Sequence, residues 1–146
     1  GTGDAYRDGC ALHEELAGKN RGFGTVLSSI RREVSRMGGH TFEAEQTMEA
    51  WSGVPAGRAD IVAHGAGQTG IVEVKVVRVM PENPRPRDAA QLGGYTALQA
   101  HWSDQLARTW AALFYVDLAT GKMKVFEFRG RELKALVRDA EEALAA

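Results

Sequence analysis

The chain has a single cysteine, Cys10, among its 146 residues. One cysteine excludes an internal disulfide, so folding does not depend on an oxidising compartment. No apolar run approaches the roughly 20 residues that a membrane-spanning helix needs, so we expect no membrane partner. The formal net charge of −1 excludes the broad positive field of a non-specific nucleic-acid coat. Any affinity for nucleic acid must therefore come from local basic patches and a bound metal ion.

The beginning of the chain lacks an initiator Met and a visible secretory signal peptide. We interpret residues 1–146 as one domain excised from a longer protein, although the scar of a tag explains the Gly1-Thr2-Gly3 start equally well. With 44% hydrophobic residues, this length suffices for one hydrophobic core. The sequence leaves the oligomeric state open.

Hydrophobic periodicity predicts a mixed α/β domain. Apolar residues recur at the helical period across 23–37, and Gly38-Gly39 is typical of a helix end. Short β-branched runs bounded by Gly or Pro indicate strands, and the prolines of 80–86 exclude a helix or a central strand there. The expected elements, in order, are helices 4–17 and 23–37, strand 40–48, a hairpin of strands 59–64 and 71–77 around a Gly-rich turn at 65–70, a helix from 87 or 88 to 102, a hairpin of strands 111–117 and 123–128, and a helix 132–144.

Glu73 and Lys75 stand out because they lie within the otherwise apolar run Ile71-Val72-Glu73-Val74-Lys75-Val76-Val77. Strand side chains alternate, so both charges project to the same face. Charges in a buried strand are costly unless they are paired or bind a metal. Asp60, on the preceding apolar segment, completes a carboxylate, carboxylate and lysine set, which is the chemistry of metal-assisted phosphodiester hydrolysis. The alternatives are that Asp60 caps a loop at the start of its strand and that Glu73 and Lys75 form an ordinary ion pair on an edge strand.

These residues resemble the PD-(D/E)XK nuclease superfamily, in which an Asp on one strand precedes Glu-x-Lys on the next. Asp60 and Glu73-Val74-Lys75 match that pattern, and Gln91 with Tyr95 looks like the QxxxY motif of the RecB and lambda-exonuclease branch. One position departs from the pattern, because Ala59 stands where a Pro often precedes the Asp. The resemblance implies a restriction-endonuclease-like αβββαβ core, with a mixed central sheet flanked by helices.

The resemblance also implies roles for the matching residues. Asp60 and Glu73 would bind Mg²⁺ or Mn²⁺ together with the main-chain carbonyl of Val74, and hard cations of this kind prefer oxygen ligands. Lys75 would orient or deprotonate the attacking water and stabilise charge on the phosphoryl oxygens. Gln91 would reach the metal-bound water or a phosphate, although a Gln beside a packing Tyr explains the same spacing.

Many members of the superfamily add an acidic residue from the first core helix. Glu33 is the best candidate, because it flanks the apolar stripe of the helix expected at 23–37. Glu14, Glu15, Glu43 and Glu45 compete with it, and a solvated surface Glu is the simpler interpretation of each.

Substrate contacts are expected from a basic, Pro-rich loop. Arg78, Arg85 and Arg87 border this loop, where guanidinium groups would bind phosphates. Tyr95 shares a helix face with Gln91 and is expected to lie half in the core and half toward the substrate.

The sequence therefore predicts a Mg²⁺-dependent DNA nuclease and leaves open whether it acts as an endonuclease or an exonuclease. One context is the toxin domain of a secreted bacterial protein that acts in the cytoplasm of a target cell and is neutralised by an immunity protein. The alternatives are a housekeeping repair or restriction nuclease of the RecB type, a nuclease that cleaves RNA, and an inactive member that binds nucleic acid or protein.

Overall fold

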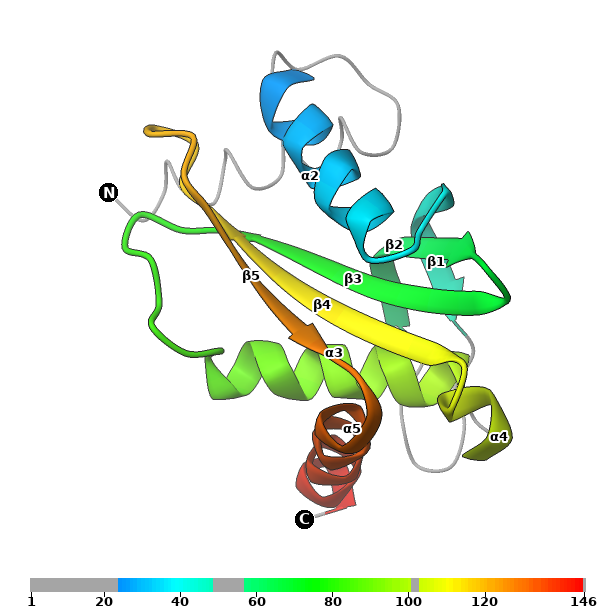
Figure 1. The fold of residues 1–146 in the computed structure, drawn as a ribbon. Helices are drawn as coiled ribbons and strands as arrows, with labels where there is room; N and C mark the ends of the chain where they lie inside the picture. The colour runs from blue at the N-terminus through cyan, green and yellow to red at the C-terminus, as the bar shows by residue number, and fades with distance from the viewer. Residues whose placement is uncertain (1–23, 49–56, 101–102, 146) are drawn as a thin grey trace.

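The computed structural model describes residues 24–48, 57–100 and 103–145. The helix expected at 4–17, Glu14 and Glu15 lie outside these ranges, as does the side chain of Glu45. The elements are α2 (Gly24–Arg36), β1 (Thr41–Met48), β2 (Gly57–Gly65), β3 (Gln68–Val76), α3 (Pro86–Gln99), α4 (Ser103–Leu106), β4 (Thr109–Val116), β5 (Met123–Phe128) and α5 (Gly130–Ala145) (Figure 1).

The five strands form one mixed sheet in the order β1-β2-β3-β4-β5. Neighbouring strands are antiparallel except β3 and β4, which are parallel. Parallel neighbours need a long crossover, and α3 and α4 provide it. The mixed α/β fold with a central sheet and flanking helices is thus confirmed. No described helix has the length and apolarity that crossing a membrane requires.

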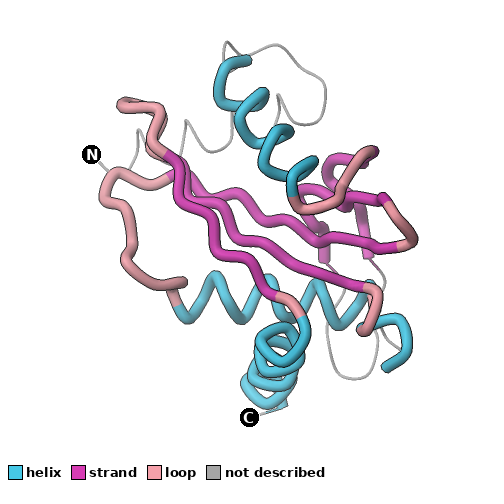
Figure 2. The backbone as a smooth tube through the Cα atoms, viewed as in Figure 1, coloured by secondary structure: helices cyan, strands magenta, loops and turns pink. Residues whose placement is uncertain are grey.

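Helices cover the sheet on both faces (Figures 1 and 2). On one face α2 packs Leu27, Ile30 and Val34 against a cluster that includes Val72 and Phe114. On the other face α3 and α5 pack over a second cluster, whose buried members include Val62, Ile71, Leu92, Leu113 and Leu133. A strand buried on both faces is apolar at nearly every position, which explains the continuous apolar runs of β3 and β4.

The turn between β2 and β3 is shorter than the sequence suggested. Its two residues, Ala66 and Gly67, have φ values of 53° and 75°, the pair of positive values that a type I′ hairpin turn requires. The expected turn at 65–70 is therefore wrong. Gly70 belongs to β3, and a Cβ atom there would lie 2.2 Å from the ring of Trp110. This glycine marks a close approach of an indole ring to the backbone, and not a turn.

Candidate functional site

β2 and β3 separate before either strand ends. Their ladder runs from Gly65↔Gln68 to Ile61↔Val72. Beyond that pair, among the described residues, β2 pairs with β1 alone, and β3 pairs with β4 alone. We call the point of separation, formed by Asp60, Glu73 and Val74, the fork. Main-chain groups that would bond across a continued ladder need other partners at this point.

The two carboxylates of the fork provide those partners. The N–H of Asp60 donates to Oε1 of Glu73 at 3.1 Å, and the N–H of Val74 donates to Oδ2 of Asp60 at 2.7 Å. Asp60 is 8% exposed and Glu73 is 2% exposed, so both side chains are buried. A strand residue directs its N–H and C=O to the same edge, so the carbonyl of Val74 also points into the fork.

The electrostatics of the fork favour bound positive charge. Burial raises the pKa of Glu73 well above its usual 4.5, and repulsion from the neighbouring Asp60 raises it further. The bond from the Asp60 N–H and the charge of Lys75 lower the pKa of Glu73 but do not offset the burial. Glu73 therefore retains a proton at pH values where an exposed Glu is ionised. A cation that binds both carboxylates would replace that proton.

The residues of the fork fit a hard divalent cation. Two buried carboxylates and a main-chain carbonyl supply oxygen ligands, which Mg²⁺ and Mn²⁺ accept together with several waters. Within the described ranges no group of three His, Cys, Asp or Glu side chains gathers to form an all-protein cage. A metal ion at the fork would therefore keep open positions for water or substrate.

Lys75 lies beside the fork and is linked to α3. Its Nζ donates to Oε1 of Gln91 at 2.5 Å, and Nε2 of Gln91 donates to the hydroxyl of Tyr95 at 3.1 Å. Gln91 and Tyr95 are four residues apart, so they share one face of α3. The structure therefore brings together five residues singled out from the sequence, namely Asp60, Glu73, Lys75, Gln91 and Tyr95.

Glu33 is not part of this group. It lies on α2, which covers the opposite face of the sheet, and its Oε2 is 2.9 Å from Nη2 of Arg36. The structure does not bring Glu33 next to Lys75, because the sheet lies between its helix and Lys75, and a catalytic role for Glu33 stays a prediction. Glu43 lies near the turn end of β2, where its carboxylate is 3.9 Å from Nε2 of His64.

Two of the three arginines lie between β3 and α3, and the third lies at the start of α3. All three side chains are exposed: Arg78 follows the end of β3, Arg85 is the N-cap residue of α3, and Arg87 lies in its first turn. The guanidinium of Arg85 lies 5.6 Å from the centroid of the Tyr115 ring. This loop leaves the same end of β3 that carries Lys75 (Figure 1).

The sequence did not indicate that Asp88 and Tyr115 lie beside the site. The Tyr115 hydroxyl donates to Oδ2 of Asp88 at 2.6 Å and accepts from the N–H of Arg85 at 3.0 Å. Tyr115 is fully buried. Burial, followed by the bond to Asp88, raises the pKa of Tyr115 to about 12. Two features of the sequence could have indicated this pair: a Tyr in the buried run Thr109–Val116, which must place its hydroxyl beside a partner, and an Asp in the first turn of α3.

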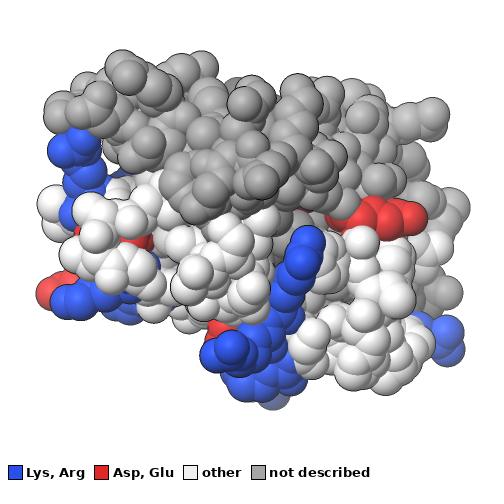
Figure 3. Space-filling view, turned by 90° about the horizontal axis from the view of Figure 1, so that it is seen from above, with Lys and Arg blue, Asp and Glu red and all other residues white. Residues whose placement is uncertain are grey.

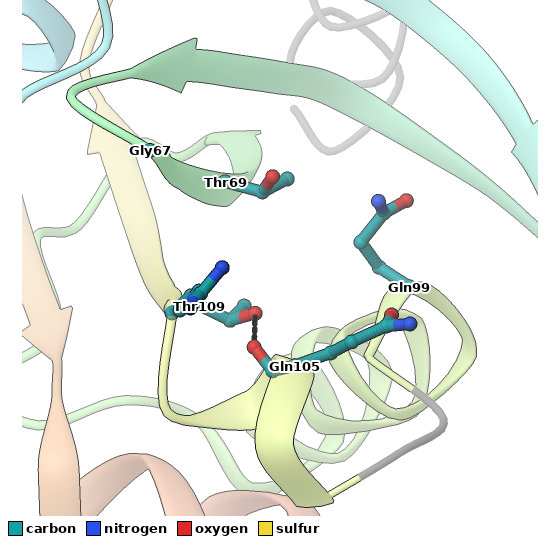
Figure 4. Close-up of a pocket in the computed structure, with 6 residues that line it drawn as sticks. Gly67, Thr69, Gln99, Gln105 and Thr109 are labelled. Atoms are coloured by element: carbon teal, nitrogen blue, oxygen red, sulfur yellow. Dashed lines mark hydrogen bonds between the residues drawn. The ribbon is translucent and has the colours of Figure 1, made fainter.

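A separate cavity lies at the other end of β3. Its volume is about 190 Å³, and its lining is Gly67, Thr69, Gln99, Gln105, Arg108 and Thr109. Figure 4 shows Thr69 and Gln99 facing each other across the opening, while Thr109 donates to the carbonyl of Gln105 at 2.7 Å. None of these described lining residues carries a carboxylate.

Charged groups are dispersed on the face seen from above in Figure 3. Its coloured atoms show blue and red side chains in separate groups, with white surface between them. More blue than red is visible on this face, and the largest blue group lies near the lower edge of the view.

No family model and no curated protein matches this chain. Solved structures do match it. One is described as the crystal structure of SSO0001, with 19% sequence identity and a TM-score of 0.50. The match covers 82% of this chain and 54% of that chain, so this domain spans about half of its length. At this identity the similarity concerns the fold alone.

Proposed function

We propose that this domain is a Mg²⁺-dependent nuclease that hydrolyses phosphodiester bonds in DNA. The observation that carries the proposal is the pair of buried carboxylates at the fork, with Lys75 two residues further on the same strand face. Burying two carboxylates side by side is unfavourable in the absence of a cation. Such an arrangement is expected where a bound metal ion is needed for function.

The roles of the residues follow from their positions. Asp60 and Glu73 would hold the metal, and the carbonyl of Val74 would complete the protein ligands. When bound, Mg²⁺ supplies Lewis-acid stabilisation of the phosphoryl oxygens and favours the hydroxide form of a water. Hydrolysis would form a bond from a water oxygen to phosphorus and break the bond from phosphorus to the leaving ester oxygen. The water would give up one proton to solvent, and the leaving oxygen would take up one proton from solvent.

Lys75 would act on the charge that develops at phosphorus. Its bond to Gln91 fixes the position of Nζ, and an ammonium group has three N–H donors. One donor is used by Gln91, which leaves the group able to contact a phosphoryl oxygen or the attacking water. Preorganised donors of this kind typically contribute about a hundredfold to a thousandfold in rate.

The exposed arginines of the β3–α3 loop would bind DNA phosphates beside the site. The same positive groups would attract an acidic protein that covers the site. This supports the toxin context, in which a small acidic immunity protein neutralises the enzyme. Expression of the domain in bacteria should then be toxic, and Asp60→Ala should relieve the toxicity. Harmless expression of an active wild-type domain without a partner would favour the repair or restriction context.

Plasmid cleavage tests the proposed activity. Supercoiled DNA is incubated with the wild type in Mg²⁺ or in EDTA, and with Asp60→Ala, Glu73→Ala and the control Glu33→Ala. We expect cleavage only in Mg²⁺, no cleavage by the first two variants, and full cleavage by the control, because Glu33 lies across the sheet. Single-stranded DNA and RNA substrates identify the preferred nucleic acid. Cleavage that survives EDTA or Asp60→Ala refutes the proposal.

A further inference from the structure

The N-terminus of α3 is capped by a side chain from β4. Arg85 is the N-cap residue, and its own side chain makes no capping bond. In a capping box, the side chain of the third helical residue reaches back to the N-cap N–H. Asp88 occupies that third position, but the hydroxyl of Tyr115 lies between the two groups: it accepts from Arg85 and donates to Asp88. A residue of the sheet thus completes the cap of the helix.

This cap has little freedom to move. The Tyr115 ring is fully buried and meets the ring of Phe126 edge-on, with 5.9 Å between the centroids. The bond from the hydroxyl to the carboxylate is short, at 2.6 Å, as expected for a charged acceptor. With a pKa of about 12, the hydroxyl keeps the proton that it donates to Asp88. Tyr115 therefore fixes where α3 begins relative to β4.

The same cap lies next to the Lys75–Gln91 bond. Tyr115 is the register partner of Lys75 across β3 and β4. Asp88 and Gln91 are three residues apart, so they lie on one side of α3. Two side-chain bridges, Tyr115–Asp88 and Lys75–Gln91, thus join neighbouring strand positions to neighbouring turns of the helix. Because a helix rises 1.5 Å per residue, a shift of α3 by a fraction of a turn would separate Gln91 from Lys75.

We propose that Tyr115 and Asp88 are a positioning pair, which holds α3 at the height where Gln91 meets Lys75 and so places the lysine for turnover. This inference rests on the proposed nuclease function. Neither residue needs to touch the substrate. Their effect passes through Gln91, and that route distinguishes them from a bridge that only stabilises the fold.

The first test is the turnover of Tyr115→Phe, which removes the hydroxyl and keeps the ring. Misplacing a catalytic group by about 1 Å costs roughly a hundredfold, so we expect kcat to fall between tenfold and a hundredfold with KM and the Mg²⁺ requirement unchanged. Asp88→Asn keeps an acceptor oxygen and should retain most of the activity that Asp88→Ala loses. Phe126→Leu is the matched control, because it disturbs the Tyr115 ring but not the hydroxyl.

A double-mutant cycle then tests the route. In a Gln91→Ala background, Tyr115→Phe should cause no further fall in kcat, because the contact that it positions is already absent. Independent, multiplicative losses would overturn the proposal and leave Tyr115 as a structural residue. If Tyr115→Phe does not fold, Asp88→Ala, at a half-buried position of the first helical turn, takes its place in the cycle.

A second measurement does not depend on nuclease activity. An amine-acylating reagent is applied to the metal-free protein, and modification of Lys75 is followed by peptide mass spectrometry. Gln91→Ala and Tyr115→Phe should both raise the rate at Lys75 severalfold, and Phe126→Leu should not. An unchanged rate in Tyr115→Phe overturns the positioning role. An inactive wild type with the expected acylation pattern instead refutes the nuclease proposal and leaves the link from Tyr115 to Lys75 intact.

Discussion

Replacing Glu73 by Gln should make the metal-free domain more stable. Glu73 is buried beside Asp60, and its pKa is raised well above 4.5. Between that value and its raised pKa, the folded protein holds a proton that the unfolded chain has released. The stability that the proton of Glu73 contributes is therefore fully present below pH 4.5 and is lost as the pH rises through the folded pKa of Glu73. Gln requires no proton and removes this loss.

The size of the effect follows from one proton per molecule. Between pH 4.5 and the raised pKa of Glu73, each pH unit lowers the free energy of unfolding by about 1.4 kcal/mol. Mg²⁺ should act in the opposite direction, because it binds the ionised pair. At a Mg²⁺ concentration about 100 times its Kd, the folded wild type gains about 2.7 kcal/mol. For a domain of this size that corresponds to a rise in Tm of roughly 5–10 °C.

Urea unfolding at several pH values, with EDTA or with Mg²⁺, measures both effects. We expect the metal-free Glu73→Gln variant to unfold at higher urea than the wild type above pH 4.5, with the difference growing with pH. We expect no stabilisation of that variant by Mg²⁺. A wild type whose stability does not fall with pH in EDTA, or a variant that Mg²⁺ stabilises fully, would show that the fork is not a proton-linked metal site.

Three further predictions concern single residues. Lys75→Met should lower kcat about a hundredfold to a thousandfold while the rise in Tm with Mg²⁺ persists; equal losses in DNA binding and rate would make Lys75 a simple phosphate contact. Gly70→Ala should destabilise the domain by about 3 kcal/mol or more, because its Cβ would overlap the Trp110 ring. Gly67→Ala, where no atom of the described residues lies within 4 Å of the added Cβ, should cost only about 1 kcal/mol from its positive φ; equal losses of stability in the two variants, measured by urea unfolding, would contradict this prediction. Between pH 10 and 12 the free energy of unfolding should fall by about 3 kcal/mol more in the wild type than in Tyr115→Phe. The reason is that the folded pKa of Tyr115 is raised to about 12, so the stability that its proton contributes is lost as the pH rises through that value. Equal pH dependence of the unfolding free energy in the two proteins would contradict this prediction.

Much of the fold could be predicted from the sequence because its strands are apolar and its helices have regular stripes. The register of the hairpin could not. A turn over residues 65–70 would have placed Asp60 opposite Lys75, whereas the observed turn at Ala66 and Gly67 places it opposite Glu73. The positive φ values of Ala66 and Gly67 set this register. An Ala-Gly pair in a sequence only weakly indicates a turn of this type.

The position of Glu33 could not be predicted for a different reason. An apolar stripe shows that α2 packs on the sheet, but it does not show on which face. The stripe of α2 lies on one cluster, and Lys75 with Gln91 lies on the other side of the sheet. The Tyr115–Asp88 bond is also hidden from the sequence, because it joins residues 27 positions apart through the packing of α3 on β4.

The fork has a consequence for how this domain folds. Asp60 and Glu73 are separated by one tight hairpin, so their contact closes a short loop and forms with little loss of chain entropy. The β3–β4 pairing, by contrast, requires the whole crossover through α3 and is expected to form later. We therefore expect the carboxylate pair to assemble from local contacts before the sheet is complete. Insertions at the exposed Thr120-Gly121 turn between β4 and β5, far along the chain from that hairpin, should leave its formation unaffected.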